Sequence, residues 1–81
     1  MHILRDELPV LRAKGKVTQE EIATRVGISR QTYSAIETGK REMSWTVFLA
    51  LLVVFNSDSK TRQVLESVDG FSIEVDEEIR L

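Results

Sequence analysis

The apolar residues near the N-terminus recur at helical spacing. Three leucines lie four and then three residues apart, which places them on one side of a helix. Pro9 falls on the same stretch and has no backbone N–H, so we expect the helix to begin near residue 6, with the proline in its first turn. Because Gly15 provides a C-terminal stop, the pattern predicts a short helix over residues 6–14. The leucines are Leu4, Leu8 and Leu11.

Two further amphipathic stripes follow, joined by a glycine. Thr18 and Glu21 have the spacing of a capping box, in which the threonine hydroxyl accepts from the N3 amide and the carboxylate accepts from the cap amide. This predicts a helix over about residues 19–25. Gly27 then fits a turn that needs a positive φ or a very close approach of the helices.

The next stripe begins after Ser29, which is suited to cap a helix over about residues 30–38 that Gly39 ends. Two short helices joined by a sharp turn present the second one outward, in the geometry with which proteins enter the DNA major groove. The residues of the pair that would build the fold are Ile22, Ala23, Val26, Gly27, Ile28, Tyr33 and Ile36.

A fourth helix, over about residues 45–55 and capped by Ser44, is hydrophobic nearly all round. A helix of this kind must be covered on more than one side. Its core stripe is Phe48, Leu51, Leu52 and Phe55, and its further apolar residues are Leu49, Val53 and Val54.

The C-terminal residues extend this helical domain. Residues 61–68 are predicted to form a fifth helix, and the alternation of apolar and polar residues after the turn signal Asp69-Gly70 is typical of a short strand that needs a partner. We therefore divide the chain into a DNA-binding helical domain, residues 1–56, and an extension, residues 57–81, which either dimerises the protein or covers the fourth helix. The alternating apolar residues are Phe71, Ile73 and Val75.

The composition is that of one small globular domain. The chain has 81 residues, of which 42% are hydrophobic and 30% charged. It has no cysteine, which excludes disulfides and thiolate metal sites and fits a reducing compartment. The longest apolar run, from Val47 to Phe55, is about half of what a membrane span requires, so we expect a cytoplasmic protein that does not bind membranes.

The sequence contains no pattern of catalytic or metal-binding residues. Its single histidine, His2, is near the terminus, and no glycine-rich loop is present to hold a phosphate. Glu20 and Glu21 are adjacent on a helix and do not face each other. We expect no enzymatic activity, no cofactor and no metal.

The net charge of −2 hides an uneven distribution. Residues 1–45 hold eight basic and six acidic side chains, a balance of +2, whereas residues 46–81 hold three basic and seven acidic ones, a balance of −4. Because the field at a binding face depends on local charge, an acidic C-terminal part need not oppose phosphate binding by the first half.

An extended motif surrounds the two central helices. It comprises Leu11-Arg12, Thr18 to Ala23, Val26 to Ser29, Ile36-Glu37 and Gly39 to Arg41. The motif resembles the helix-turn-helix of the phage Cro/repressor-like (xenobiotic response element) family of DNA-binding proteins, over about residues 8–55. The resemblance implies an all-α, lambda-repressor-like DNA-binding domain of four to five helices, here with a short β-prone C-terminal tail.

The resemblance also implies roles for individual side chains. Gln19 would bind a phosphate and brace the recognition helix, at about residues 30–38. On its outward face Arg30 would suit guanine and Gln31 adenine, and residues at and after its end would hold phosphates. Ser29 is more a cap than a base contact. The complete predicted DNA-binding set is Gln19, Ser29, Arg30, Gln31, Thr32, Ser34, Thr38, Lys40 and Arg41.

Four positions add structural expectations from the same resemblance. Arg12 and Glu37 match a partly buried ion pair, which would lock the first helix to the third. Tyr33 stands where family members usually have Val or Ile, so its hydroxyl must find a partner or water. Ala35 is small where a long polar side chain is common, which limits it to contact with a thymine methyl group.

We interpret the chain as a double-stranded-DNA-binding repressor, two copies of which occupy a pseudo-palindromic operator. Dimerisation is inferred from the fourth helix and the tail, and the alternative is that the tail folds back over that helix. Two other functions stay open: an antitoxin-like protein whose tail neutralises a toxin, and an adaptor that bridges proteins. The candidate dimer residues are Trp45, Leu49, Val53, Val54, Phe71, Ile73 and Val75.

Overall fold

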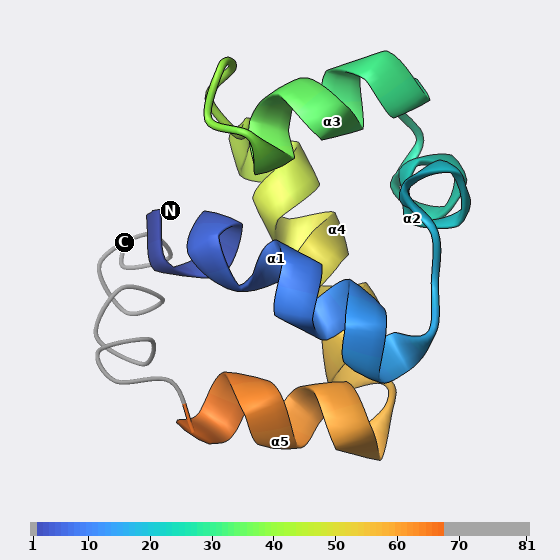
Figure 1. Cartoon of the computed structure of the whole chain (residues 1–81), viewed down its shortest axis with the longest axis vertical. Coiled ribbons are helices and arrows are strands. Elements are labelled where there is room, and N and C mark those ends of the chain that lie inside the picture. Colours follow the sequence, from blue (N-terminus) through green and yellow to red (C-terminus); the bar gives the residue numbers. More distant parts are fainter. Residues whose placement is uncertain (1, 68–81) are drawn as a thin grey trace.

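The computed structural model describes residues 2–67, and these residues form five α-helices and no strand (Figure 1). The helix bounds are α1 His2–Gly15, α2 Gln19–Val26, α3 Arg30–Glu37, α4 Trp45–Asn56 and α5 Ser59–Ser67. The predicted all-α class is therefore confirmed for this part of the chain. The strand that the sequence predicts around residues 71–75 lies outside the described residues.

α1 is longer than predicted, because it begins at His2, about one turn earlier. Pro9 lies inside it and removes the backbone hydrogen bond that would reach the carbonyl of Arg5. An interior proline costs about 3 kcal/mol, but burying a leucine side chain contributes about 1.5–3 kcal/mol, so three buried leucines outweigh it. The fully buried leucines are Leu4, Leu8 and Leu11.

The end of α1 also differs from the prediction. The helix includes Gly15, and the left-handed residue that follows it is Lys16, with φ 56°. Gly15 is a site of close packing instead, since a Cβ placed on it would lie 3.3 Å from Cγ2 of Thr61 in α5. A glycine that ends a helix and a glycine that lets two helices approach have the same sequence signature, which is why the prediction was wrong.

The next three helices begin where their caps predict. Thr18 and Glu21 form both hydrogen bonds of the capping box at α2. Ser29 and Ser44 each accept the N3 amide at the start of α3 and α4. Gly27 ends α2 in the left-handed conformation, with φ 79°, as the predicted turn requires. These local signals fix the turn between α2 and α3.

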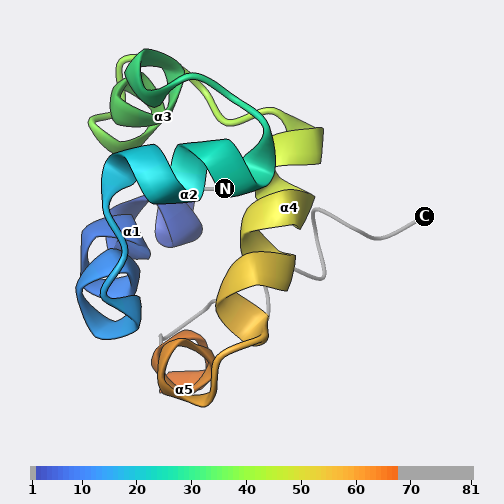
Figure 2. The same ribbon diagram turned by 90° about the vertical axis from the view of Figure 1, so that its right-hand side faces the viewer.

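α5 packs against both α1 and α4, and Figure 2 shows it beneath them. It begins at Ser59, before the predicted start at residue 61. The buried hydroxyl of Thr61 donates to the carbonyls of Phe55 and Asp58, which ties the first turn of α5 to the end of α4. All five helices contribute to one buried core or border it; its members are Leu4, Leu8, Leu11, Ile22, Ala23, Tyr33, Ile36, Met43, Val47, Phe48, Leu51, Phe55 and Leu65.

Candidate nucleic-acid interface

α3 is held by one face and exposes the other. Tyr33 and Ile36 enter the core, to which α2 contributes Ile22 and Ala23. The helix lies at the outer edge of the molecule in both Figure 1 and Figure 2, with its other side turned away from the remaining helices. α3 therefore has the position of a helix that can enter a groove of a nucleic acid.

The first turn of α3 is fixed by two hydrogen bonds between the same residues. Ser29 Oγ accepts from the Thr32 amide at 3.1 Å and donates to Thr32 Oγ1 at 2.9 Å. The proton of the Ser29 hydroxyl and one of its two lone pairs are therefore used in the cap. Thr32 keeps its own hydroxyl proton for another acceptor.

The outward face of α3 offers donors and acceptors that the fold does not use. Arg30 and Gln31 are exposed, and Ser34 is half-buried. Within residues 2–67, the side chains of these three make no hydrogen bond or ion pair. A free guanidinium and a free amide can each form the bidentate contacts that distinguish base pairs in the major groove. Ala35, also half-buried, has no polar group to add.

Thr38, at the end of α3, is less available than the sequence suggests. Its hydroxyl donates to the carbonyl of Ser34 at 2.9 Å and lies 3.3 Å from that of Ala35. A phosphate accepts hydrogen bonds only, so Thr38 would have to rotate its hydroxyl away from α3 to bind one.

The predicted ion pair between α1 and α3 is present. Arg12 donates to Glu37 through Nε at 2.9 Å and through Nη2 at 2.8 Å. The side chain of Glu37 is only 8% exposed, and that of Arg12 is 22% exposed. Gln19 Nε2 is 3.5 Å from the same carboxylate, so the amide at the start of α2 is joined to the pair. This network fixes α3 relative to α1 and α2.

The charges of this network shift the pKa values of its members. Burial would raise the pKa of Glu37, but hydrogen bonds, above all from Arg12, outweigh it and hold that pKa below its ordinary value. The bond to Glu37 raises the pKa of Arg12. Burial, and next the neighbouring Glu37, raises the pKa of Tyr33. The pair is therefore charged at neutral pH, and Tyr33 is protonated.

Tyr33 fills the core, but its hydroxyl does not find the expected partner. The side chain is fully buried, and its hydroxyl makes no hydrogen bond within the described residues. The sequence predicted a partner or a water for this group. No protein group within residues 2–67 is therefore the partner, and the burial of the ring stabilises Tyr33 in the core.

The turn after α3 carries the two predicted phosphate-binding cations. Gly39 has φ 81°, as expected for a residue that ends a helix. The amides of Lys40 and Arg41 both donate to the carbonyl of Ala35, at 2.8 and 3.1 Å, so the turn is folded back on α3. Both side chains are exposed, and neither has a partner in the described part of the chain.

Sequence reasoning missed Arg5, which lies against this turn. A Cβ placed on Gly39 would be 3.6 Å from its Nη1. The first helix was predicted to begin near residue 6, so Arg5 was expected to precede it and could not be placed beside the turn. The uninterrupted leucine stripe across Pro9 was the signal that could have located it.

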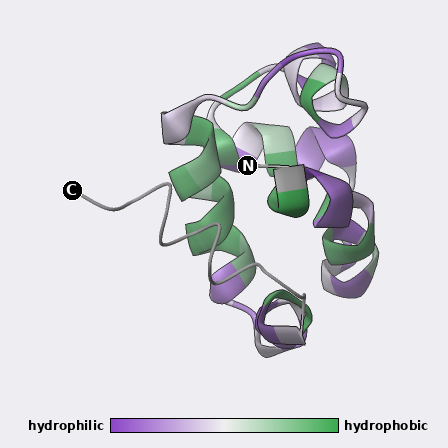
Figure 3. Ribbon diagram, turned by 90° about the vertical axis from the view of Figure 1, so that its left-hand side faces the viewer, coloured by the Kyte–Doolittle hydropathy of each residue, from purple (hydrophilic) through white to green (hydrophobic). Residues whose placement is uncertain are grey.

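Part of α4 remains uncovered by the described residues. Trp45, Leu49 and Val53 recur every fourth residue and are 43%, 37% and 70% exposed. Val54 is half-buried and packs against the core. Figure 3 shows α4 as a hydrophobic ribbon along one side of the molecule. The other predicted dimer residues, Phe71, Ile73 and Val75, lie outside the described residues.

The remaining surface shows little that suggests another site. A shallow groove of about 310 Å³ between α1 and α5 is lined by side chains that include Lys14, Lys60 and Val64. Residues 2–67 contain no group of three side chains placed to hold a metal ion. None of their helices is long and apolar enough to cross a membrane.

Comparison with known proteins agrees with this architecture. A family model described as a helix-turn-helix domain matches residues 3–65. An uncharacterised HTH-type transcriptional regulator from Archaeoglobus fulgidus is 39% identical over 54 residues, which cover 67% of this chain and 76% of that protein. Another from Methanocaldococcus jannaschii is 44% identical over 41 residues, which cover 51% of this chain and 62% of that protein.

No solved structure matches the chain significantly. The assignment therefore rests on the family model, on these relatives and on the helices themselves. A capped α2, a left-handed glycine and an outward α3 are the parts of a helix-turn-helix, and the matched region includes all of them. The chain belongs to the helix-turn-helix domain family of DNA-binding regulators, in the Cro/repressor-like class that its motif predicted.

Proposed function

We propose that the protein binds specific sequences in double-stranded DNA through the outward face of α3 and represses transcription from the site it covers. The free side chains of Arg30, Gln31 and Ser34, on a helix whose other face is locked into the core, support this most strongly. A helix that is already fixed by the fold loses little conformational freedom on binding. Its polar groups can therefore be used for recognition.

Base recognition in this proposal is divided between two long side chains. Arg30 hydrogen-bonds O6 and N7 of a guanine, and Gln31 hydrogen-bonds N6 and N7 of an adenine. Ser34 contributes one further contact, and Ala35 packs on a thymine methyl group. With so few base contacts, one copy of the protein binds weakly.

Phosphate contacts on both sides of α3 set its position in the groove. Gln19 donates to a phosphate from the start of α2, and Lys40 and Arg41 bind phosphates from the turn after α3. Thr38 also binds a phosphate only if its hydroxyl breaks the hydrogen bond that it donates to the carbonyl of Ser34. These contacts give affinity without sequence preference.

The protein acts as a homodimer in this proposal, joined through the exposed stripe of α4. Trp45, Leu49 and Val53 form an apolar surface that a two-fold axis could bury against its own copy. Two recognition helices then reach half-sites about 34 Å apart, or a multiple of that distance. Within this arrangement residues 1–56 carry DNA binding, and residues 57–81, which include α5, form the extension that dimerises the protein or covers α4.

Selection from a pool of random duplexes tests the proposal directly. The wild-type protein should enrich one site with two-fold symmetry, in which each half contains a guanine and an adenine as its most constrained positions. Recovery of unrelated sequences at the frequency of the starting pool would contradict sequence-specific binding. Enrichment of a single asymmetric half-site would contradict the dimer while leaving the role of α3 intact.

A further inference from the structure

The guanidinium of Arg5 packs on the turn that follows the recognition helix. A Cβ placed on Gly39 would be 3.6 Å from Arg5 Nη1, 3.8 Å from Cζ and 4.0 Å from Nε, so the group lies over the space that this glycine leaves open. Arg5 belongs to α1, and it has a helical position beside the turn because α1 begins at His2. The same turn carries Lys40 and Arg41.

Most of the hydrogen-bond donors of this guanidinium are unused. Within residues 2–67 its hydrogen bonding is limited to Nε, which is 3.4 Å from Asp6 Oδ1, and its side chain is 34% exposed. An exposed ion pair of this kind contributes little to stability and is readily exchanged. The Nη groups form the planar fork that matches the oxygens of a phosphate.

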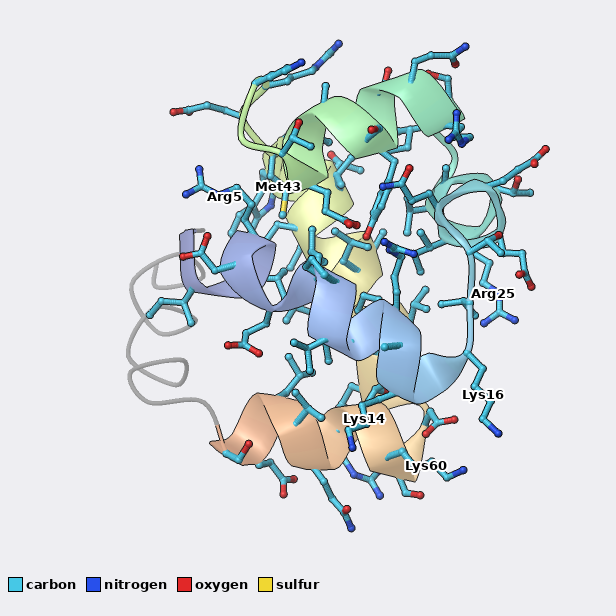
Figure 4. The ribbon with its side chains drawn as sticks, in the orientation of Figure 1. Arg5, Lys14, Lys16, Arg25, Met43 and Lys60 are labelled. Atoms are coloured by element: carbon cyan, nitrogen blue, oxygen red, sulfur yellow. The ribbon has the colours of Figure 1, made fainter. Side chains whose placement is uncertain are left out.

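Arg5 therefore adds a third cation to the turn after α3, supplied by a helix outside the helix-turn-helix pair. Figure 4 shows Arg5 at the end of the molecule where this turn lies, and Lys14 and Lys60 at the opposite end. We infer that Arg5 binds the DNA backbone together with Lys40 and Arg41, as a phosphate contact contributed by α1. The inference rests on the proposed DNA-binding function and enlarges the surface that carries it.

A purely structural role for Arg5 has different consequences. α3 ends at Glu37, and its carbonyl end carries a partial negative charge that a nearby cation stabilises. Loss of that role would lower the melting temperature without changing how DNA binding depends on salt. Loss of a phosphate contact changes the salt dependence, because each neutralised phosphate releases counterions and contributes a slope of about −0.9.

The test is the salt dependence of binding to a fluorescein-labelled duplex of random sequence, about 30 base pairs long, measured by anisotropy between about 50 and 200 mM NaCl. For Arg5→Gln we expect the slope of log K against log salt concentration to become shallower by about 0.9 for each copy of the protein bound, as for Lys40→Gln. Lys60→Gln removes an exposed cation on the far side and should keep the wild-type slope. Arg5→Lys keeps the charge and should recover most of the slope.

The outcomes separate this inference from the proposed function. A wild-type slope for Arg5→Gln, beside a shallower slope for Lys40→Gln, overturns the inference and leaves the proposed function standing. Failure of the wild-type protein to bind any duplex overturns both. Arg5→Met is a second neutral variant, which keeps an aliphatic side chain beside Gly39 and is used if Arg5→Gln melts below the assay temperature. It should show the same loss of slope, and a wild-type slope for Arg5→Met would also overturn the inference.

Discussion

At the scale of single residues, Glu37 holds the recognition helix in place. Its carboxylate accepts two hydrogen bonds from Arg12 of α1 and lies 3.5 Å from the amide of Gln19 in α2. Gln19 is also the residue that we propose as a phosphate ligand. One buried carboxylate therefore positions α3, which we propose contacts bases, and holds the side chain of Gln19, which we propose contacts the DNA backbone.

The pH dependence of stability should reveal this carboxylate. Because the pKa of Glu37 is lowered in the folded protein, its contribution is fully present above the ordinary glutamate pKa, near 4.5, and is lost as the pH falls through the lower folded value. Urea unfolding of wild type and Glu37→Gln between pH 7 and pH 3 measures it. The wild-type protein should be the more stable at pH 7, and the difference should narrow below about pH 4.5. A difference that stays constant down to pH 3 would show that Glu37 is not stabilised in its charged form.

At the scale of elements, α1 has an unusual residue in its interior and another just after its last residue. It continues through Pro9 and ends at Gly15, and Lys16, which follows it, takes a left-handed conformation that costs a residue with a Cβ roughly 1 kcal/mol. Both features are tolerated because the leucine stripe fixes the helix in the core. The end of α1 is therefore a place where stability can be gained.

Lys16→Gly should stabilise the protein by about 1 kcal/mol, because glycine adopts a positive φ without a steric penalty. The matched control is Lys14→Gly, an exposed lysine inside α1, which should destabilise by about 1 kcal/mol through lost helix propensity. Thermal or urea unfolding measures both. If both substitutions lower the free energy of unfolding equally, Lys16 does not carry the conformational strain described here.

The local signals in the sequence predicted α2, α3 and α4 well, because each helix begins at a cap whose hydrogen bond is made within three residues. The Arg12–Glu37 pair was also predicted, although only from the family resemblance. The length of α1 could not be predicted from local rules, because packing in the core outweighed the proline. The position of Arg5 beside Gly39 depends on that length, so it escaped prediction for the same reason.

At the scale of the whole molecule, the exposed stripe of α4 should determine the oligomeric state. Val53 is 70% exposed, so Val53→Lys should leave the monomer folded while placing a charge in the proposed interface. We expect light scattering at micromolar concentration to show a dimer for wild type and a monomer for this variant. Gln63→Lys, an exposed change on α5, should remain a dimer. A wild-type protein that is a monomer both alone and on a two-fold DNA site would contradict the proposed dimer.

Under the proposed function, the same architecture lets a protein with few base contacts select a site. α3 provides two long polar side chains, the turn after it provides cations, and the core joins both rigidly to α4, where a second copy can bind. In this proposal the affinity comes from phosphate contacts and from the binding of two copies of the protein, whereas the sequence preference comes from Arg30 and Gln31. Removing a base contact should therefore lower the affinity for the selected site and leave the affinity for unrelated DNA unchanged.

The most direct measurement is the ratio of affinities for the selected duplex and for a scrambled duplex, determined at one salt concentration. Gln31→Ala should lower this ratio by roughly 5- to 150-fold for each half-site contact that is lost, which corresponds to about 1–3 kcal/mol, and leave binding to the scrambled duplex unchanged. Gln63→Ala, an exposed glutamine on α5, should keep the wild-type ratio. If Gln31→Ala and Arg30→Ala both keep the wild-type ratio, the outward face of α3 does not recognise the DNA sequence.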